Sequence, residues 1–312
     1  MASISAGSYT DGYVGVAPGA ELLVVKLKQS KQYLRDFFLI KDDVPAFEES
    51  DIMLALRFLE DYAIRLGKPL IIIFGLGSAN GSRTGASPLA EMMENLTKKP
   101  NISVITCMGN EANNKCHYKG TVMSALVPDV MEINVDGTGK GFTMEIWADS
   151  LDILSVSIES PSGEYVPRIP ARMGASMEYT FLYEGSTVTV DYQITENVAG
   201  MEVIFVRLKT PVEGTWKFYI YSLTNIKGSY NAWLPLKQFS GQDIYFLKSD
   251  PDTTLTVPAA ADGVISVGAY NHYTGAAYYE SGRGYSADGR IKPDFVAPGA
   301  GVYGCLLYTS DA

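Results

Sequence analysis

Residues 69–77, PLIIIFGLG, decide the fold class of this chain. The run is apolar and closes on two glycines, which is typical of a strand buried on both faces of a parallel sheet. A helix is expected from about Ser87 to Lys98, and a second largely apolar strand follows in ISVITCMG, residues 102–109. Strand, helix and strand in this order predict a parallel βαβ unit.

Two further elements are expected upstream of this unit. Ser50 is placed to cap a helix that Gly67 would end and Pro69 would follow. Apolar side chains between them fall at helical spacing: Ile52, Ala55, Leu56, Leu59, Tyr62, Ala63 and Leu66. Residues 15–28, GVAPGAELLVVKLK, predict a turn that leads into another buried strand. Together these elements predict an α/β fold with a parallel sheet and flanking helices.

The pattern changes after Gly120, where apolar and polar residues alternate with period two in segments such as FTMEIWA and MEVIFVRL. Glycine-containing turns separate these segments at the intervals of a β-sandwich. Residues 122–247 carry 8 basic and 15 acidic side chains, a net charge of −7. The α/β pattern returns in TVPAAADGVISVGAY, residues 256–270, so the acidic all-β block is expected to be an insertion into the α/β domain.

Composition excludes several classes of function. The chain has 312 residues, 46% of them hydrophobic, which is enough for two domains with their own cores. Its net charge of −10 argues against a nucleic acid or an anionic membrane surface as partner. No apolar run is long enough to span a bilayer. Three cysteines, at positions 107, 116 and 305, are too few for a disulfide framework or a four-ligand zinc site.

Three short signatures, in this order, resemble the subtilisin family of serine peptidases: FGLGSANGS at 74–82, CMGNEANN at 107–114 and SGRGYSADGRIKPDFVAPG at 281–299. The resemblance implies a subtilisin-like parallel sheet and hydrolysis of peptide bonds through an acyl-enzyme. It also implies that Gly75, Leu76 and Gly77 border the substrate cleft, where an extended peptide pairs by backbone hydrogen bonds. Gly75 replaces the serine usual in the family.

The second signature implies an oxyanion hole. Asn110 matches the family asparagine whose side chain donates to the developing oxyanion, a donor typically worth about 2.7–4 kcal/mol in the transition state. Taken alone, the Gly-Asn dipeptide favours a turn after a buried strand, and it is the flanking signatures that favour the oxyanion role for Asn110. Met108 and Gly109, with Cys107, would line the primary specificity pocket, although Cys107 and Met108 are also ordinary core residues.

The triad itself is expected outside this chain. MASISAG at residues 1–7 resembles the sequence that follows the family's His-Gly-Thr motif, which places the catalytic His and Asp before Met1. The family nucleophile lies in Gly-Thr-Ser-Met-Ala, a context that Ser310 in LLYTSDA does not share. Ser310 is therefore a doubtful nucleophile. His117 and His272 are expected to be solvated loop residues, and the chain, truncated at both ends, is expected to be inactive.

The inserted block resembles the jelly roll of clostridial spore-germination proteases, one branch of the family. The expected parts are a subtilase domain at 1–120, a jelly-roll sandwich at 122–247, the continued subtilase domain at 248–304 and a non-native tail at 305–312, which resembles translated sequencing adapter. The alternatives are a pseudoprotease or regulatory binding protein of the same fold, and a jelly-roll binding module with a decayed host domain.

The resemblance also bears on partners. It implies a protein or peptide substrate, no organic cofactor and a secreted or spore-associated location. Calcium sites are common in the family, but the sequence does not define the clustered oxygen ligands that such a site needs. Oligomeric state is left open.

Overall fold

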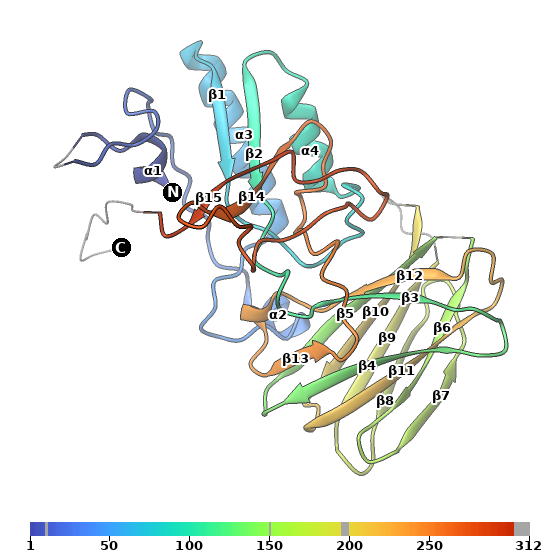
Figure 1. Cartoon of the computed structure of the whole chain (residues 1–312). Helices are drawn as coiled ribbons and strands as arrows, with labels where there is room; N and C mark the ends of the chain where they lie inside the picture. The colour runs from blue at the N-terminus through green and yellow to red at the C-terminus, as the bar shows by residue number, and fades with distance from the viewer. Residues whose placement is uncertain (10–11, 150, 195–199, 303–312) are drawn as a thin grey trace.

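The computed structural model describes residues 1–9, 12–149, 151–194 and 200–302. Figure 1 shows two parts, a parallel sheet with helices and a larger sandwich of antiparallel strands. The sandwich strands all lie between His117 and Phe246, whereas the strands of the parallel sheet come from both sides of that interval. In the chain, the sandwich therefore lies between two strands of the parallel sheet.

The parallel sheet has the strand order β1-β2-β14-β15. Its strands are β1 (Leu70–Phe74), β2 (Ile102–Cys107), β14 (Ile265–Asn271) and β15 (Phe295–Ala300). Each adjacent pair is parallel, with Leu70 opposite Ile102 and Ile265 opposite Ile105. Helix α4 (Pro88–Thr97) connects β1 to β2, which confirms the predicted βαβ unit.

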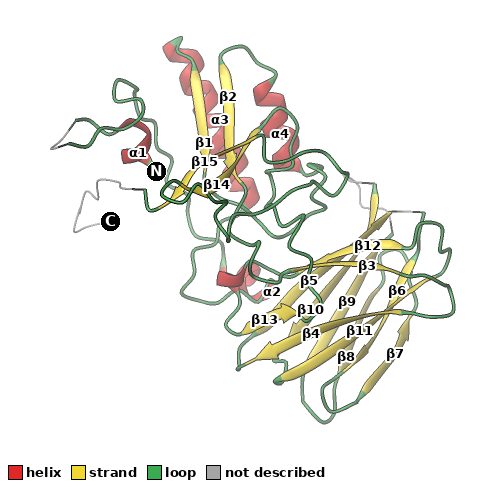
Figure 2. Cartoon of the chain, viewed as in Figure 1, coloured by secondary structure: helices red, strands yellow, loops and turns green. Residues whose placement is uncertain are grey.

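Helices α3 (Glu49–Leu66) and α4 pack against the sheet (Figure 2). Their apolar side chains share one core with the sheet: Leu56, Ile72, Phe74, Leu89, Ala90, Met93, Leu96, Val104, Ala261 and Val264. Ser87 caps α4 by accepting the backbone N–H of Ala90 at 3.1 Å. Gly67 ends α3 in the left-handed conformation, as predicted, but α3 begins at Glu49 and Ser50 lies inside the helix.

The strand expected within residues 15–28 is not formed. Residues 21–30 belong to no helix or strand, and Leu22 and Val24 are 56% and 75% exposed. A strand is stable only beside a hydrogen-bonded neighbour, and no described segment pairs with these residues. Local apolar character alone was therefore an insufficient signal.

The sandwich consists of two antiparallel sheets. The six-stranded sheet has the order β3-β12-β5-β10-β9-β8, and the five-stranded sheet has the order β13-β4-β11-β6-β7. The strands are β3 (His117–Thr121), β4 (Asp129–Asp136), β5 (Gly141–Asp149), β6 (Leu154–Glu159), β7 (Tyr165–Ile169), β8 (Ser176–Thr180), β9 (Thr187–Gln193), β10 (Met201–Lys209), β11 (Gly214–Ser222), β12 (Ser229–Trp233) and β13 (Asp243–Phe246).

One apolar core fills the space between the two sheets. It joins side chains of the six-stranded sheet such as Ile146 and Val206 to side chains of the five-stranded sheet such as Ile133, Trp216 and Phe218. Along β4 and β11 the core residues alternate with more exposed ones, which is the period-two pattern seen in the sequence, whereas β5 is buried at eight of its nine positions. The largest buried side chains of the molecule lie mostly here, so the sandwich has a core of its own.

The short helix α2 (Gln32–Phe37) joins the two parts. Phe37 stacks on Phe205 of β10 at a centroid distance of 5.8 Å, and the Arg207 guanidinium lies 4.6 Å from the Phe37 ring. Lys140 pairs with Asp42, close to the helix in sequence, at 2.5 Å. These contacts hold the outer face of the six-stranded sheet against the α/β part. Two short helices complete the fold: α1 (Ala2–Ala6) and the 3₁₀ helix η1 (Lys237–Phe239).

Glu202, at the start of β10, is a fully buried acid. Its Oε2 accepts the backbone N–H of Leu154 at 2.8 Å, while no described group donates to Oε1. Burial raises the pKa of Glu202 to about 8, and nearby Asp152 acts in the same direction. The folded protein therefore holds this carboxyl in its neutral form at neutral pH.

We expect this acid to make the stability of the sandwich depend on pH. The unfolded carboxyl releases its proton near its ordinary pKa of 4.5 and the folded one near pH 8, so stability falls as pH rises across that window. The isosteric Glu202→Gln variant should remove most of this fall and be more stable than the parent at pH 8, by on the order of 4 kcal/mol. Chemical denaturation between pH 5 and pH 8, followed by tryptophan fluorescence, measures the effect.

Glu159→Gln is the matched control. Glu159 is partly exposed, and its hydrogen bonds to Tyr219 and Lys217 lower its pKa. Its replacement should lower stability by a similar amount at both pH values and leave the slope between them intact. A parent protein as stable at pH 8 as at pH 5 would contradict a buried neutral Glu202.

Candidate active site

Three segments meet where β1 and β2 end, at one edge of the parallel sheet. They are Gly75–Ser78 after β1, Met108–Asn110 after β2 and Thr254–Val257 on the return from the sandwich. The backbone N–H of Thr256 donates to the carbonyl of Met108 at 3.0 Å. Ser78 and Val257 exchange two backbone hydrogen bonds, of 3.0 and 2.9 Å. The third segment thus joins the first two into one surface.

The position of Thr256 explains why residues 77 and 109 are glycines. A Cβ placed on Gly77 would lie 2.6 Å from Cβ of Thr256, and a Cβ on Gly109 would lie 2.5 Å from its Cγ2. Gly109 also has a φ of +84°, which disfavours any side chain. Sequence reasoning missed Thr256, because its residue type is ordinary for a strand. The signal was indirect: two glycines needed a neighbour that approaches closely.

Gly75 faces the start of the chain. A Cβ on Gly75 would lie 2.6 Å from Sδ of Met1, so α1 begins beside the predicted cleft strand. Gly75 is exposed, and Leu76 and Gly77 are half-buried. The strand therefore keeps an accessible edge past the end of β1.

Asn110 is exposed at the end of the second segment. Its backbone carbonyl accepts Nδ2 of Asn114 at 3.1 Å, and the same Nδ2 donates to Oε2 of Glu111 at 2.9 Å. Within the described residues the side-chain amide of Asn110 makes no hydrogen bond, so its N–H groups are free to donate to a ligand. Glu111 behind it is buried, and burial raises the pKa of its carboxyl.

Met108 has a different setting. Its side chain is buried against Leu255, Ala259 and Ala260, in a small core under the site. Gly282 lies against its carbonyl, and a Cβ there would come within 2.9 Å of the Met108 carbonyl carbon. In this structure Met108 supports the loop from below, and the role of its side chain in a specificity pocket stays a prediction.

The loop after the cleft strand is fastened to the sandwich. The backbone N–H of Gly81 donates to Oε2 of Glu145 at 2.7 Å, and Trp147 Nε1 donates to the same oxygen at 2.8 Å. The buried Arg83 guanidinium lies 4.4 Å from the Trp233 ring and donates to the Gly81 carbonyl at 2.6 Å. Burial lowers the pKa of Arg83 to about 10. A buried charge such as the Arg83 guanidinium is stable only while its hydrogen-bond and charge partners stay in position, so these contacts fix the loop against the sandwich.

The expectation that His117 is a solvated loop residue is wrong. His117 begins β3, is fully buried and stacks on Trp233 at 5.0 Å, while its Nε2 is 3.0 Å from Oδ1 of Asn231. Burial lowers the pKa of this imidazole. The ring was misjudged because nothing local in the sequence indicates that a tryptophan far along the chain covers it. His272 is exposed, as expected, with Nδ1 3.0 Å from the Ala300 carbonyl. Ser310 lies outside the described residues.

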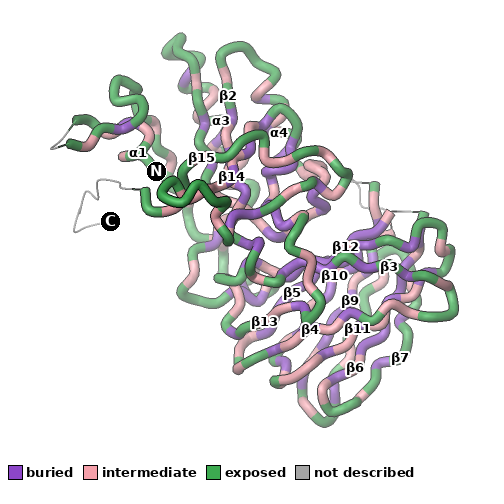
Figure 3. The backbone as a smooth tube through the Cα atoms, in the orientation of Figure 1, coloured by how far each residue is buried: buried purple, intermediate pink, exposed green. Residues whose placement is uncertain are grey.

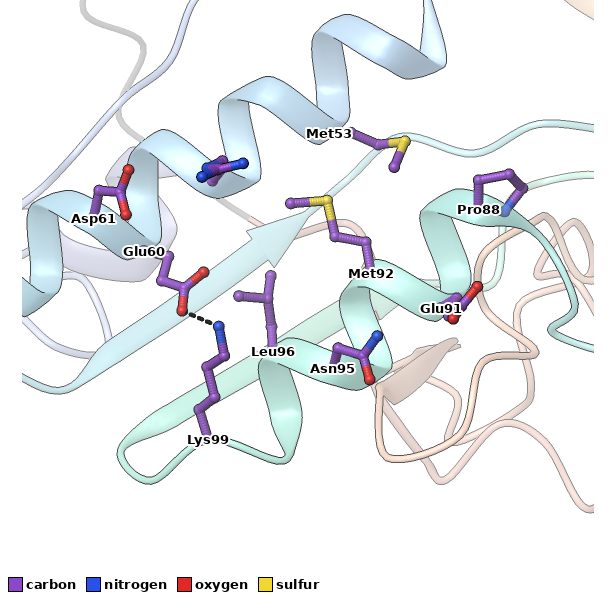
Figure 4. Close-up of a pocket in the computed structure, with 10 residues that line it drawn as sticks. Met53, Glu60, Asp61, Pro88, Glu91, Met92, Asn95, Leu96 and Lys99 are labelled. Atoms are coloured by element: carbon purple, nitrogen blue, oxygen red, sulfur yellow. Dashed lines mark hydrogen bonds and ion pairs between the residues drawn. The ribbon is translucent and has the colours of Figure 1, made fainter.

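A hollow of about 560 Å³ between α3 and α4 lies elsewhere (Figure 4). It is lined by Met53, Arg57, Glu60, Asp61, Pro88, Glu91, Met92, Asn95, Leu96 and Lys99, none of which is a predicted site residue. Lys99 and Glu60 form an ion pair across it. In the described parts of the chain no group of three or more His, Cys, Asp or Glu side chains could hold a metal ion. No described helix is both long enough and apolar enough to cross a membrane.

Comparison with known proteins gives a family and a fold. Residues 1–311 match the model of the subtilase family. Among solved structures, the CspB protease of Clostridium perfringens is similar, with a TM-score of 0.84 and 24% sequence identity over 98% of this chain. The chain spans 62% of the length of that structure. No curated protein sequence matches. At this identity the structural likeness establishes the fold alone.

The close approach at Gly109 can be tested by substitution. Gly109→Ala should destabilise the protein through both its positive φ and the overlap with Thr256, by about 2–4 kcal/mol in total. Gly137→Ala is the control, because Gly137 has a similar φ of +79° and open space around it. The control should cost about 1–2 kcal/mol, from backbone strain alone. Equal losses at the two positions in urea denaturation would contradict the contact, whereas Thr256→Ala added to Gly109→Ala should recover the difference.

Proposed function

This chain belongs to the subtilase family of serine peptidases, and from that premise we propose that it supplies the substrate cleft and the oxyanion donor of a subtilisin-like endopeptidase. The observation that carries the proposal is the meeting of Gly75–Gly77 with Gly109–Asn110 around Thr256, with the Asn110 amide exposed and unbonded within the described residues. These segments lie within the sequence signatures that resemble the subtilisin family, and this resemblance supports the same assignment.

The cleft strand has the properties that peptide binding needs. An extended substrate forms backbone hydrogen bonds with a neighbouring strand edge, which requires that no side chain block its approach. Beyond the end of β1, Gly75 is exposed and Leu76 and Gly77 are half-buried, and the two glycines carry no side chain of their own, although Met1 and Thr256 approach them. A protein or peptide is therefore the proposed substrate.

Asn110 acts on the charge that develops during the reaction. Attack of a serine hydroxyl on the scissile carbonyl moves an electron pair onto the carbonyl oxygen, while the serine proton passes to a histidine base. The Asn110 side-chain N–H would donate to that oxyanion. The histidine then delivers the proton to the leaving amine, and water hydrolyses the acyl-enzyme by the same steps.

The triad is proposed to lie outside the described residues. His117 is buried on Trp233, and His272 bonds the Ala300 carbonyl, so neither is hydrogen-bonded to a described serine. The match of residues 1–7 to the sequence after the family His-Gly-Thr motif supports the same placement. We propose that residues 1–116 and 248–304 form the peptidase domain, because residues 117–121, whose first four were predicted to belong to it, pair with β12 in the sandwich.

Residues 122–247, together with the sandwich strand β3 (His117–Thr121) that precedes them, are proposed to be a jelly-roll insertion. Eight of its strands follow the orders β3-β12-β5-β10 and β4-β11-β6-β7, which support two Greek keys in facing sheets, with β8, β9 and β13 added. The fold likeness to the CspB protease agrees with membership of the spore-germination branch, which we propose for this chain. In such a protease the sandwich would hold the loop at Gly81–Arg83 beside the substrate cleft.

The purified chain tests the placement of the triad. We expect it to hydrolyse no peptide and to take no label from a fluorophosphonate probe, because no described serine has an imidazole partner. A label that disappears in Ser310→Ala would assign the nucleophile to Ser310 and contradict the placement. Inhibitor-sensitive hydrolysis by the chain would do the same.

Asn110 is tested in a polypeptide in which this chain is joined to segments that carry the family His-Gly-Thr and Gly-Thr-Ser motifs. Asn110→Ala should lower kcat by about 10²- to 10³-fold with little change in KM, because the donor acts only in the transition state. Asn113→Ala, an exposed neighbour in the same loop, should keep full activity. An unchanged kcat in Asn110→Ala would remove Asn110 from the oxyanion hole. A gene product with a substituted triad would favour a regulatory binding protein instead.

A further inference from the structure

Three loops at one end of the sandwich expose large apolar side chains. We call them the apolar loop end: residues 122–128 between β3 and β4, 151–153 between β5 and β6, and 223–228 between β11 and β12. The exposed side chains are Met123, Leu126, Val127, Leu151, Leu223 and Ile226. Met123 and Leu126 are 84% and 90% exposed, so they project from the surface. Monomeric proteins seldom gather so many exposed apolar side chains without a partner.

Hydrogen bonds join the three loops into one surface. The backbone N–H of Val122 donates to the Gly228 carbonyl at 2.8 Å, and Leu223 N–H donates to the Ile153 carbonyl at 2.8 Å. Thr224 Oγ1 donates to the Leu151 carbonyl at 2.7 Å. The apolar side chains are therefore carried on a connected rim, which Figure 3 shows as exposed loops on the side of the sandwich away from α2.

Most of the projecting residues of these loops donate their backbone N–H groups to acceptors within the protein. Buried Asp152 accepts the N–H groups of Ile226, Lys227 and Gly228 at 2.6, 2.9 and 2.7 Å. Leu126 N–H donates to Ser124 Oγ at 3.2 Å, and Leu151 N–H donates to Asp149 Oδ1 at 3.1 Å. A loop that leaves water must satisfy its N–H groups internally, because hydrocarbon offers them no acceptor. The loops meet this condition at Leu126, Val127, Leu151, Leu223 and Ile226, whereas no described group accepts the backbone N–H of Met123.

Charge is almost absent from the apolar loop end, although the sandwich as a whole is acidic. The described residues of the three loops contain two charged side chains, Asp152 and Lys227. Asp152 is buried, and Lys227 pairs with Asp149 at 2.5 Å. Burying this end would therefore desolvate very little net charge, in contrast to the surface of the remaining sandwich.

We propose that the apolar loop end binds a lipid surface by inserting these side chains into the interfacial region of a bilayer. Separate projecting side chains suit a fluid interface, which needs no shape matching, better than a protein surface, which does. The overall charge of −10 opposes anionic lipid, so the contact is driven by apolar burial and fits zwitterionic headgroups. Such binding is peripheral and involves no membrane-spanning segment.

Sedimentation of the whole chain with phosphatidylcholine vesicles tests the proposal. The parent protein should sediment with the vesicles and should continue to do so at high salt, since apolar contacts are not screened. The variant Met123→Ser, Leu126→Ser, Ile226→Ser should lower the partition coefficient by at least about tenfold. Unchanged thermal melting of this variant would show that its fold is intact.

The matched control is Leu182→Ser with Tyr183→Ser. Both residues are 84% exposed in the β8–β9 hairpin. That hairpin lies at the opposite end of the sheet, because Thr187 pairs with Lys209 and Lys209 with Gly141, whereas Asp149 pairs with Met201. The control should bind vesicles as the parent does. A parent that stays in the supernatant, or an equal loss in the control, would overturn the proposal. Association between copies in the absence of lipid that the triple variant abolishes would identify a protein interface instead and would also overturn it.

Discussion

The geometry of this molecule depends on one covalent constraint: β2 and β14 are neighbours in the parallel sheet, yet the whole sandwich lies between them in the chain. The constraint is met because the segments that leave and re-enter the α/β part run side by side. Phe246 N–H donates to the Lys115 carbonyl at 3.0 Å, and Asp250 N–H donates to the His117 carbonyl at 2.8 Å. The returning chain then reaches Thr256, whose contacts with Gly77 and Gly109 close the candidate site.

The sandwich also takes part in the site through its outer face. Glu145 and Trp233 contact the loop that follows the cleft strand, Trp147 donates a hydrogen bond to Glu145, and Arg83 of the loop is buried against Trp233. Asn110 and the first sandwich strand are separated by only a short loop, in which Cys116 Sγ contacts the Glu111 carbonyl at 3.5 Å. A buried guanidinium is tolerated only where carbonyls, carboxylates and an aromatic face surround it. The same groups therefore stabilise the junction and limit the movement of the loops that border the cleft.

Much of this arrangement could be predicted from sequence. The βαβ unit and the period-two strands followed from hydrophobic periodicity, and the end of α3 followed from Gly67, because these signals lie within or next to the element that they predict. Other features depend on residues far apart in the chain. The segment 21–30 is as apolar as a strand, but no described strand pairs with it, and His117 is buried because Trp233 covers it. Thr256 acquires its place from two glycines on other segments. The assignment of Asn110 to an oxyanion hole rests on resemblance, and the structure adds that its amide is exposed.

The side-by-side course of the two connecting segments has an evolutionary consequence. A module whose two ends are hydrogen-bonded neighbours can enter a surface loop between adjacent strands without displacing either strand, since the host has to bridge the same short gap with or without it. The sandwich could thus be acquired by a host gene in a single recombination event. Substitutions after that event would then have improved the contacts at Arg83, Glu145 and Phe37, which now join the sandwich to the α/β part.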